Sequence, residues 1–140
     1  MNGTAHSILL VDDYPDALDV WRLYLEMSGF EVLTAIDGLS AVKLATERLP
    51  DIVILDLELP GITGIEAARR IRSAPETTSI PLIAATGHSQ PATLDEARRA
   101  GFDVIVTKPC DPDRLLAEIR RLLDGGTPLA ASVPASTLNR

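Results

Sequence analysis

Five side chains that can bind metals or react lie at or near the ends of four apolar runs of this sequence: Asp12, Asp13, Asp56, Thr86 and Lys108. Carboxylates bind hard divalent cations, and a lysine together with a hydroxyl group can bind an anion. A carboxylate can also act as a nucleophile. Each of these residues, taken alone, is more often a helix cap, a turn residue or a solvated surface group. Any shared function therefore depends on a fold that brings them together.

The apolar runs have the length and composition of buried strands. They cover residues 7–11, 31–35, 52–55, 80–85 and 103–106. Between and after them, apolar residues recur at helical spacing, and Pro and Gly mark the helix ends. The predicted helices cover about residues 15–28, 38–49, 64–72, 91–100 and 112–124. This alternation predicts an α/β fold of the flavodoxin-like, doubly wound type, a three-layer (βα)5 sandwich around a parallel sheet of strand order 2-1-3-4-5.

The first predicted helix carries a long apolar stripe, which indicates an amphipathic helix. The stripe consists of Ala17, Val20, Trp21, Tyr24 and Met27. We interpret the aromatic residues Trp21, Tyr24 and Phe30 as packing residues and not as a cofactor site.

The predicted strand order makes the first, third, fourth and fifth strands neighbours. Because the carboxyl ends of parallel strands meet at one edge, the five side chains named above should converge there. Three crowded carboxylates repel one another unless a cation lies among them. Mg²⁺ suits such oxygen ligands, and it keeps coordination positions for water and phosphate oxygens. A carboxylate nucleophile, a divalent metal, a lysine and a hydroxyl group together describe a site that forms an aspartyl phosphate.

Composition excludes several other classes of protein. The net charge of −7 disfavours binding to nucleic acid or to an anionic membrane surface. The single cysteine, Cys110, cannot form an internal disulfide, which fits a reducing compartment. No signal peptide or apolar run of membrane-spanning length is visible. We therefore expect a cytoplasmic protein with a flexible N-terminus at residues 1–5 and a disordered tail or linker stump at 125–140.

The sequence resembles the receiver domain of two-component response regulators, including the chemotaxis response regulators, over residues 6–124. The resemblance rests on the ordered spacing of the acidic pair Asp12-Asp13, the segment 56–64, Thr86 and Lys108-Pro109. It implies a domain that accepts a phosphoryl group from a histidine kinase or a histidine phosphotransfer protein. Such a domain is a signalling module with its own Mg²⁺-dependent phosphorylation chemistry, and it is not a conventional enzyme.

The resemblance also implies a role for each matching residue. Asp56 would be the phosphoacceptor. Asp12, Asp13, Asp56 and the backbone carbonyl of Glu58 would hold Mg²⁺, or Mn²⁺ in its place. Lys108 would pair with the phosphoryl oxygens, and Thr86 would move to hydrogen-bond one of them. A cis peptide bond is implied before Pro109.

The sequence departs from the family pattern in three respects. Ile105 stands where family members commonly carry a switching Tyr or Phe, so coupling through the fourth helix, the fifth strand and the fifth helix is in doubt. Cys110 stands where Phe is usual, so the packing under the last helix should differ, and we interpret the thiol as a small apolar filler. Glu58 and His88 should flank the path of the attacking water, and we expect them to tune the lifetime of the phosphoryl group.

We interpret the chain as a stand-alone receiver that switches a protein-binding surface formed by residues 91–100, 103–106 and 112–124. That surface would contact a downstream protein or a second copy of the chain in a homodimer. One alternative is a receiver excised from a hybrid histidine kinase or a longer regulator, and another is an adaptor that is not phosphorylated. A haloacid-dehalogenase-like phosphatase is disfavoured because Glu58 stands where such enzymes usually carry Asp. An FMN protein is disfavoured because no Ser- and Thr-rich phosphate loop follows a strand.

Overall fold

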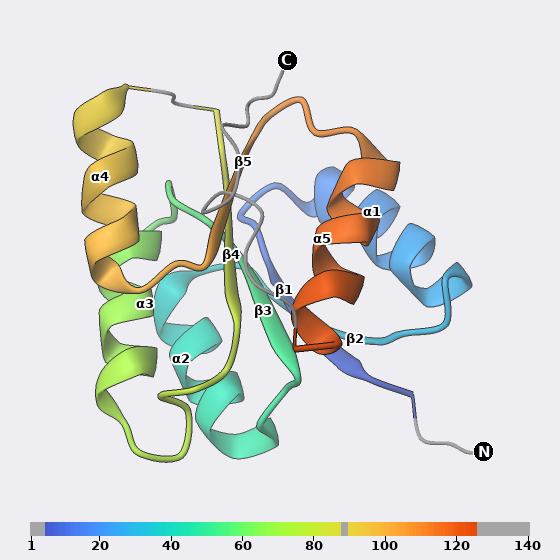
Figure 1. Ribbon diagram of the computed structural model, residues 1–140, viewed down its shortest axis with the longest axis horizontal. Helices are drawn as coiled ribbons and strands as arrows, with labels where there is room; N and C mark the ends of the chain where they lie inside the picture. The colour runs from blue at the N-terminus through green and yellow to red at the C-terminus, as the bar shows by residue number, and fades with distance from the viewer. Residues whose placement is uncertain (1–4, 88–89, 126–140) are drawn as a thin grey trace.

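The computed structural model describes residues 5–87 and 90–125. Within these residues the chain forms five strands and five helices in strict alternation (Figure 1). The strands are β1 (Ser7–Val11), β2 (Glu31–Ala35), β3 (Ile52–Asp56), β4 (Leu82–Thr86) and β5 (Val104–Thr107). The helices are α1 (Pro15–Met27), α2 (Gly38–Arg48), α3 (Gly64–Ser73), α4 (Pro91–Ala100) and α5 (Pro112–Leu123). Predictions that concern residues 1–4, His88 and 126–140 fall outside the described residues.

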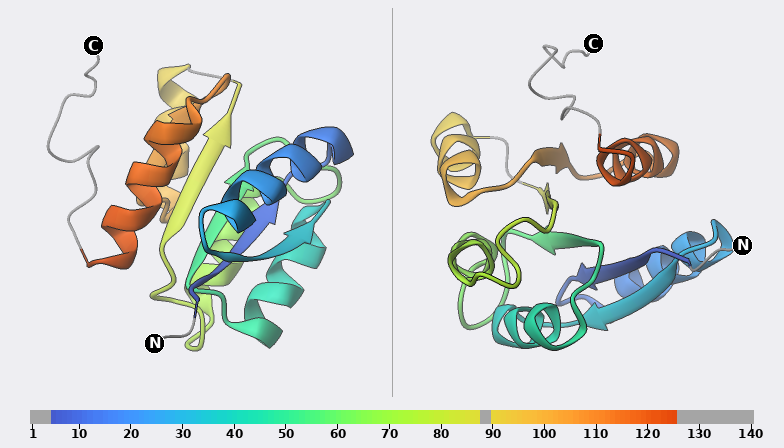
Figure 2. Two further views of the ribbon diagram at one scale, coloured as in Figure 1. Left: turned by 90° about the vertical axis from the view of Figure 1, so that its right-hand side faces the viewer. Right: turned by 60° about the horizontal axis from the view of Figure 1, so that its bottom comes forward.

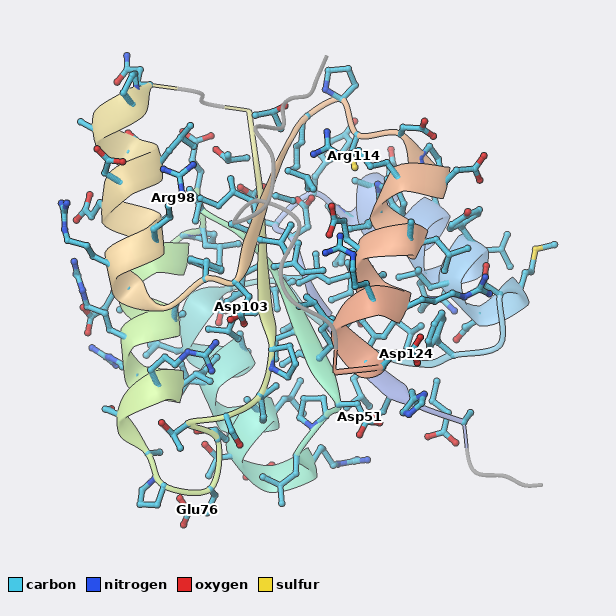
Figure 3. The ribbon with its side chains drawn as sticks, in the orientation of Figure 1. Asp51, Glu76, Arg98, Asp103, Arg114 and Asp124 are labelled. Carbon is cyan, nitrogen blue, oxygen red and sulfur yellow. The ribbon has the colours of Figure 1, made fainter. Side chains whose placement is uncertain are left out.

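The strands form one parallel sheet in the order β2-β1-β3-β4-β5, which confirms the predicted fold class and strand order. Helices α1 and α5 cover one face of the sheet, and α2, α3 and α4 cover the other (Figure 2). The carboxyl ends of the strands meet at the upper edge of the molecule in Figure 1. Figure 3 marks the two edges, since Asp51, which precedes β3, lies at the lower end and Arg114, at the start of α5, lies at the upper end.

Each face of the sheet has its own apolar core. All five residues of β3 are buried, because this central strand is covered by helices on both sides. Its alternate side chains divide between the two cores, so that Val53 and Leu55 pack toward α2–α4 while Ile52 and Ile54 pack toward α1 and α5. The aromatic residues Trp21, Tyr24 and Phe30 pack partly buried against the second core, as predicted. No helix in the described part of the chain is long and apolar enough to cross a membrane.

The buried face of α1 differs from the predicted stripe. Val20 and Met27 are 68% and 79% exposed, whereas Leu18 and Leu25 are buried. Two apolar stripes overlap on this helix, and only one can face the sheet. The stripe centred on the two leucines packs against β1 and β2, which leaves an apolar strip on the outer surface of α1.

Three strand boundaries also differ from those predicted. β3 and β4 each extend to include the polar residue at their end, Asp56 or Thr86, and β5 runs one residue later than predicted. Asp56 pairs with Ala85 and Thr86 with Thr107, because backbone ladder bonds continue past the last apolar side chain. β4 begins at Leu82, since the preceding Pro81 has no N–H to donate.

Side-chain caps fix the starts of three helices. Asp37, Thr63 and Asp111 each accept a hydrogen bond from a backbone N–H in the first turn of α2, α3 or α5. The bond from Ser40 to Asp37 is 2.7 Å long, and it lowers the pKa of that carboxyl group. Pro112 follows the Asp111 cap at the first helical position, as the sequence predicts.

Arg72 links the segments that precede β4 and β5, at the amino ends of these strands. Its guanidinium donates hydrogen bonds to the backbone oxygens of Thr78, Ile80 and Gly101, and it pairs with Asp103 at 2.9 Å. The Asp103 carboxylate also accepts the N–H of Leu82, at 2.9 Å, where β4 begins. These contacts fix β4 and β5 at their starts, so that their far ends are presented in a defined register.

Candidate functional site

The side chains predicted to meet do so at the carboxyl edge of the sheet. Asp12 directly follows β1, Asp56 ends β3 and Lys108 directly follows β5. One carboxylate oxygen from each of Asp12, Asp13 and Asp56 lies within 4.8 Å of the others. Asp13 is exposed, whereas Asp56 is only 7% exposed. The group is therefore a pocket that opens to solvent on one side and has a buried carboxylate at its base.

Lys108 is the positive counterpart of this cluster. Its Nζ donates to Asp56 Oδ2 at 2.8 Å and to Asp12 Oδ2 at 3.1 Å. Burial of the amine opposes its charged form, but the hydrogen bonds and charges of the two carboxylates outweigh burial and raise the pKa of Lys108. The lysine therefore stays positively charged across the physiological pH range, and it partly compensates the crowded carboxylates.

Backbone donors orient the two carboxylates that Lys108 contacts. Asp56 Oδ1 accepts the N–H of Glu58 at 2.9 Å, and Asp12 Oδ1 accepts the N–H of Tyr14 at 3.0 Å. Each carboxylate thus has one oxygen held by the backbone and the other facing Lys108. This arrangement points the Oδ2 atoms into the pocket, where they can meet a cation or an incoming electrophile.

Gly64 allows the loop after β3 to fold tightly beneath Asp56. Its N–H donates to the carbonyl oxygen of Leu57 at 2.9 Å. A Cβ atom added at this position would lie 2.1 Å from the backbone oxygen of Asp56 and 2.8 Å from Leu57 Cα. Only glycine permits this approach, so the residue holds the backbone of the candidate nucleophile in place. The sequence predicted Gly64 as part of the loop that ends where the helix begins, but it did not predict this close approach to the Asp56 backbone.

Thr86 borders the same pocket from the side of α4. Its side chain is buried, and its backbone oxygen accepts the N–H of Lys108 at 2.8 Å. Thr86, Glu58 and Gln90 line a shallow depression between α3 and α4 beside the carboxylates. Thr86 is therefore held beside the acidic pocket through its backbone contact with Lys108.

The other predicted positions fall around this centre. The Lys108–Pro109 peptide bond is cis. Ile105 is half-buried and packs against the core on the α2–α4 side. Cys110 is half-buried at the entry to α5, and burial raises the pKa of its thiol.

The donor set of the pocket fits a hard divalent cation. Two carboxylates from the loop after β1 and one from the end of β3 converge, and Asp13 is exposed. Hard cations such as Mg²⁺ take such oxygen ligands while keeping bound water. Among residues 5–87 and 90–125, the ligand set consists of carboxylates alone, which favours a hard cation over softer metals. Mg²⁺ therefore matches the chemistry of the residues present.

Comparison with known proteins gives a consistent result. The family model for the response regulator receiver domain matches residues 8–120. Protein PilH of Pseudomonas aeruginosa is 36% identical over 118 residues, which cover 84% of this chain and 98% of PilH. The DNA-binding dual master transcriptional regulator RpaA of Synechocystis is 36% identical over 116 residues, which cover 83% of this chain but 48% of RpaA. The chain thus spans nearly all of one relative and about half the length of the other.

A solved structure is also similar in sequence and in fold. The receiver domain of the sensor histidine kinase PA1611 of Pseudomonas aeruginosa is 28% identical, with a TM-score of 0.81. The match covers 86% of this chain and 99% of that domain. The PA1611 domain was solved with a magnesium ion coordinated in its active-site cleft.

Proposed function

The chain belongs to the response regulator receiver family, and from this membership we propose that Asp56 accepts a phosphoryl group and thereby switches a protein-binding surface. The observation that carries the proposal is the pairing of Lys108 with both Asp56 and Asp12 at the mouth of a three-carboxylate cluster. A carboxylate nucleophile lies there beside a fixed positive charge, which is what transfer of an anionic group requires.

The chemical step follows from this geometry. An Asp56 carboxylate oxygen attacks the phosphorus atom of the donor and forms a new O–P bond, while the bond from phosphorus to its leaving group breaks. The donor is a phosphohistidine of a histidine kinase or a phosphotransfer protein, or a small acyl phosphate. Lys108 then transfers its hydrogen bonds from the carboxylate to the phosphoryl oxygens. The stabilisation of the phosphoryl group by Lys108 is local, because the lysine already contacts Asp56 before phosphorylation.

Asp12, Asp13, Asp56 and the backbone carbonyl of Glu58 would hold Mg²⁺, or Mn²⁺ in its place. The cation supplies charge neutralisation for the phosphoryl oxygens and a template for their orientation. The chain's own contribution is to keep Asp12 and Asp56 aligned through the backbone donors of Tyr14 and Glu58.

We further propose that Thr86 reports the phosphoryl group to the surface. Its hydroxyl would hydrogen-bond a phosphoryl oxygen and carry the β4–α4 loop with it, which biases a two-state element. The readout surface would be the α4–β5–α5 face, and it would serve a downstream protein or a second copy of the chain. Ile105 packs on the α4 side of β5. Because it has no ring to reorient, the conformational change would have to reach the surface through a shift in the position of its side chain.

The lifetime of the phosphoryl group is a separate part of the proposal. Glu58, at the exposed rim of the pocket, and His88 are the two positions expected to control access of the attacking water. Alanine substitution of either residue should change the half-life of the phosphoprotein at least twofold. An unchanged half-life in both variants would remove this assignment without affecting Asp56.

The experiment that tests the main proposal is intact mass spectrometry after incubation with acetyl phosphate and Mg²⁺. We expect a gain of one phosphoryl group that is lost in EDTA and in Asp56→Asn. No gain in the wild-type protein under any condition would favour an adaptor that uses the fold without phosphorylation. A gain retained in Asp56→Asn would place the phosphoacceptor at another residue.

A further inference from the structure

A cavity of about 260 Å³ lies between α1 and α5, and Asp12 and Lys108 of the acidic cluster are among the residues that line it. These two helices cover the same face of the sheet (Figures 1 and 2). The walls include Ala17 and Trp21 of α1, Ala85 of β4, Leu115 of α5 and Cys110 of the loop before it. Asp12 and Lys108 close the end nearest the phosphorylation pocket.

Small side chains at three positions create this space. Ala17, Ala85 and Cys110 approach from three different elements, and none carries a side chain long enough to reach across the gap. Trp21 and Leu115 stand beside them, and both pack on the core of this face.

The chemistry of the walls favours a neutral apolar ligand. Most of the lining is hydrocarbon, and its two charged groups, Asp12 and Lys108, pair with each other at 3.1 Å. The remaining oxygen of Asp12 accepts the N–H of Tyr14. The thiol of Cys110 lies 3.5 Å from the backbone oxygen of Asp111, and burial raises its pKa, so it adds no negative charge to the wall. An ion placed in this cavity would lose its hydration without gaining an unpaired partner.

We propose that this cavity is a binding site for a neutral, compact aromatic molecule of one or two rings. Pockets lined mostly by apolar side chains, with few polar groups, accept such molecules, and this one is large enough for them. The Trp21 ring supplies an aromatic wall, which favours a flat ligand over a branched one. The site is distinct from the phosphoryl pocket but shares Asp12 and Lys108 with it, so a bound ring would contact the residues that hold the phosphoacceptor.

Trp21 is the only tryptophan of the chain, and its place in the wall gives a direct assay. Bromobenzene is a suitable probe because it is neutral, and its bromine quenches indole fluorescence only on contact. Titration of the wild-type protein in EDTA should give a saturable loss of Trp21 emission, on top of the linear loss caused by collisions. Because neither Mg²⁺ nor a phosphodonor is present, the result does not depend on whether Asp56 is phosphorylated.

Variants of one position separate the cavity from the surface. Cys110→Phe fills the space and should weaken the saturable component at least tenfold, whereas Cys110→Ala keeps the space and should stay within twofold of the wild-type protein. Met27→Ala, on the outer face of α1, should change nothing, because that residue is 79% exposed. If Cys110→Phe fails to fold by circular dichroism, Ala17→Leu fills the same space from α1.

Strictly linear quenching in the wild-type protein would overturn the proposal. Saturable quenching that survives both filling variants would overturn it as well, since the probe would then bind to the surface. Loss of saturation in Met27→Ala would move the binding site to the exposed strip of α1.

Discussion

Replacement of Lys108 by methionine removes the only amine from the acidic pocket and leaves a side chain of similar length. In the wild-type protein Nζ makes two charge-assisted hydrogen bonds, of 2.8 Å to Asp56 and 3.1 Å to Asp12. Such bonds contribute about 1.5–3 kcal/mol each when buried. The lysine side chain is 37% exposed, so solvent screening reduces each contribution to roughly half. We therefore expect Lys108→Met to lower the free energy of unfolding by about 2 kcal/mol in the absence of a divalent cation.

Magnesium should reduce this loss. Among the described residues, the ion pairs of Asp12 and Asp56 are with Lys108, and the variant loses both. A bound cation should therefore stabilise the folded variant more than it stabilises the folded wild-type protein, in which Lys108 already compensates the carboxylates. Urea unfolding at pH 7, followed by far-UV circular dichroism, measures both quantities from the shift in midpoint at constant slope. Lys43→Met is the matched control, because Lys43 is the other lysine of the sequence and lies exposed on α2. It should change stability by less than about 0.5 kcal/mol.

Two results would refute this reasoning. If Lys108→Met is as stable as Lys43→Met in EDTA, the ion pairs of the apo pocket contribute nothing measurable. If the variant loses the same stability with and without Mg²⁺, the lysine and the cation do not compensate the same carboxylates.

Three further predictions concern pH, charge and packing. Because the folded state raises the pKa of Lys108, its stabilising contribution is complete below the unfolded pKa of about 10.4 and is lost as pH rises through the higher folded value. The stability difference between the wild-type protein and Lys108→Met should therefore stay constant from about pH 7 to 9 and shrink above about pH 10.4, as urea unfolding across that range would show. Asp13→Asn should raise the unfolding midpoint in EDTA, because it removes one of the mutually repelling carboxylates, and should weaken stabilisation by Mg²⁺; an unchanged midpoint in both conditions would place Asp13 outside the cluster. Gly64→Ala should cost about 3 kcal/mol and reduce phosphorylation of Asp56, because the new Cβ meets the backbone oxygen of that residue at 2.1 Å. Gly61→Ala is the control, because it strains the backbone at a φ of 78° but its new Cβ meets no atom within 4 Å. It should lower the free energy of unfolding by only about 1–2 kcal/mol and leave phosphorylation intact. Equal losses of stability in the two variants would show that backbone strain, and not the clash, dominates.

The fold could be predicted from the sequence because strands buried on both faces and helices with one apolar face leave distinct patterns. The order of the sheet then placed Asp12, Asp56 and Lys108 at one edge, because parallel strands end on the same side. The predicted strand order and the positions at which the strands end were therefore sufficient to predict the cluster.

Other features depend on contacts that no local pattern records. The buried face of α1 was mistaken because Val20 and Met27 continue one apolar stripe while Leu18 and Leu25 form another, and only packing on the sheet selects between them. The contact of Lys108 with Asp12 as well as Asp56 depends on the conformations of two loops. The cavity beside Trp21 requires three small side chains from three elements, and each of them is unremarkable in its own segment.

The bridge from Lys108 to Asp12 joins positions 96 residues apart in the chain. During synthesis on the ribosome, all three carboxylates have been made when translation passes residue 56, but their lysine is added only after β5, at position 108. Until then the nascent domain carries concentrated negative charge without its internal counterion, and β4 and β5 have still to complete the sheet. With Asp56 as phosphoacceptor, a growing or prematurely terminated chain cannot assemble a working site. On the proposed function, competence to accept a phosphoryl group would require the chain up to Lys108, so molecules that end before β5 would not draw phosphoryl groups away from finished ones.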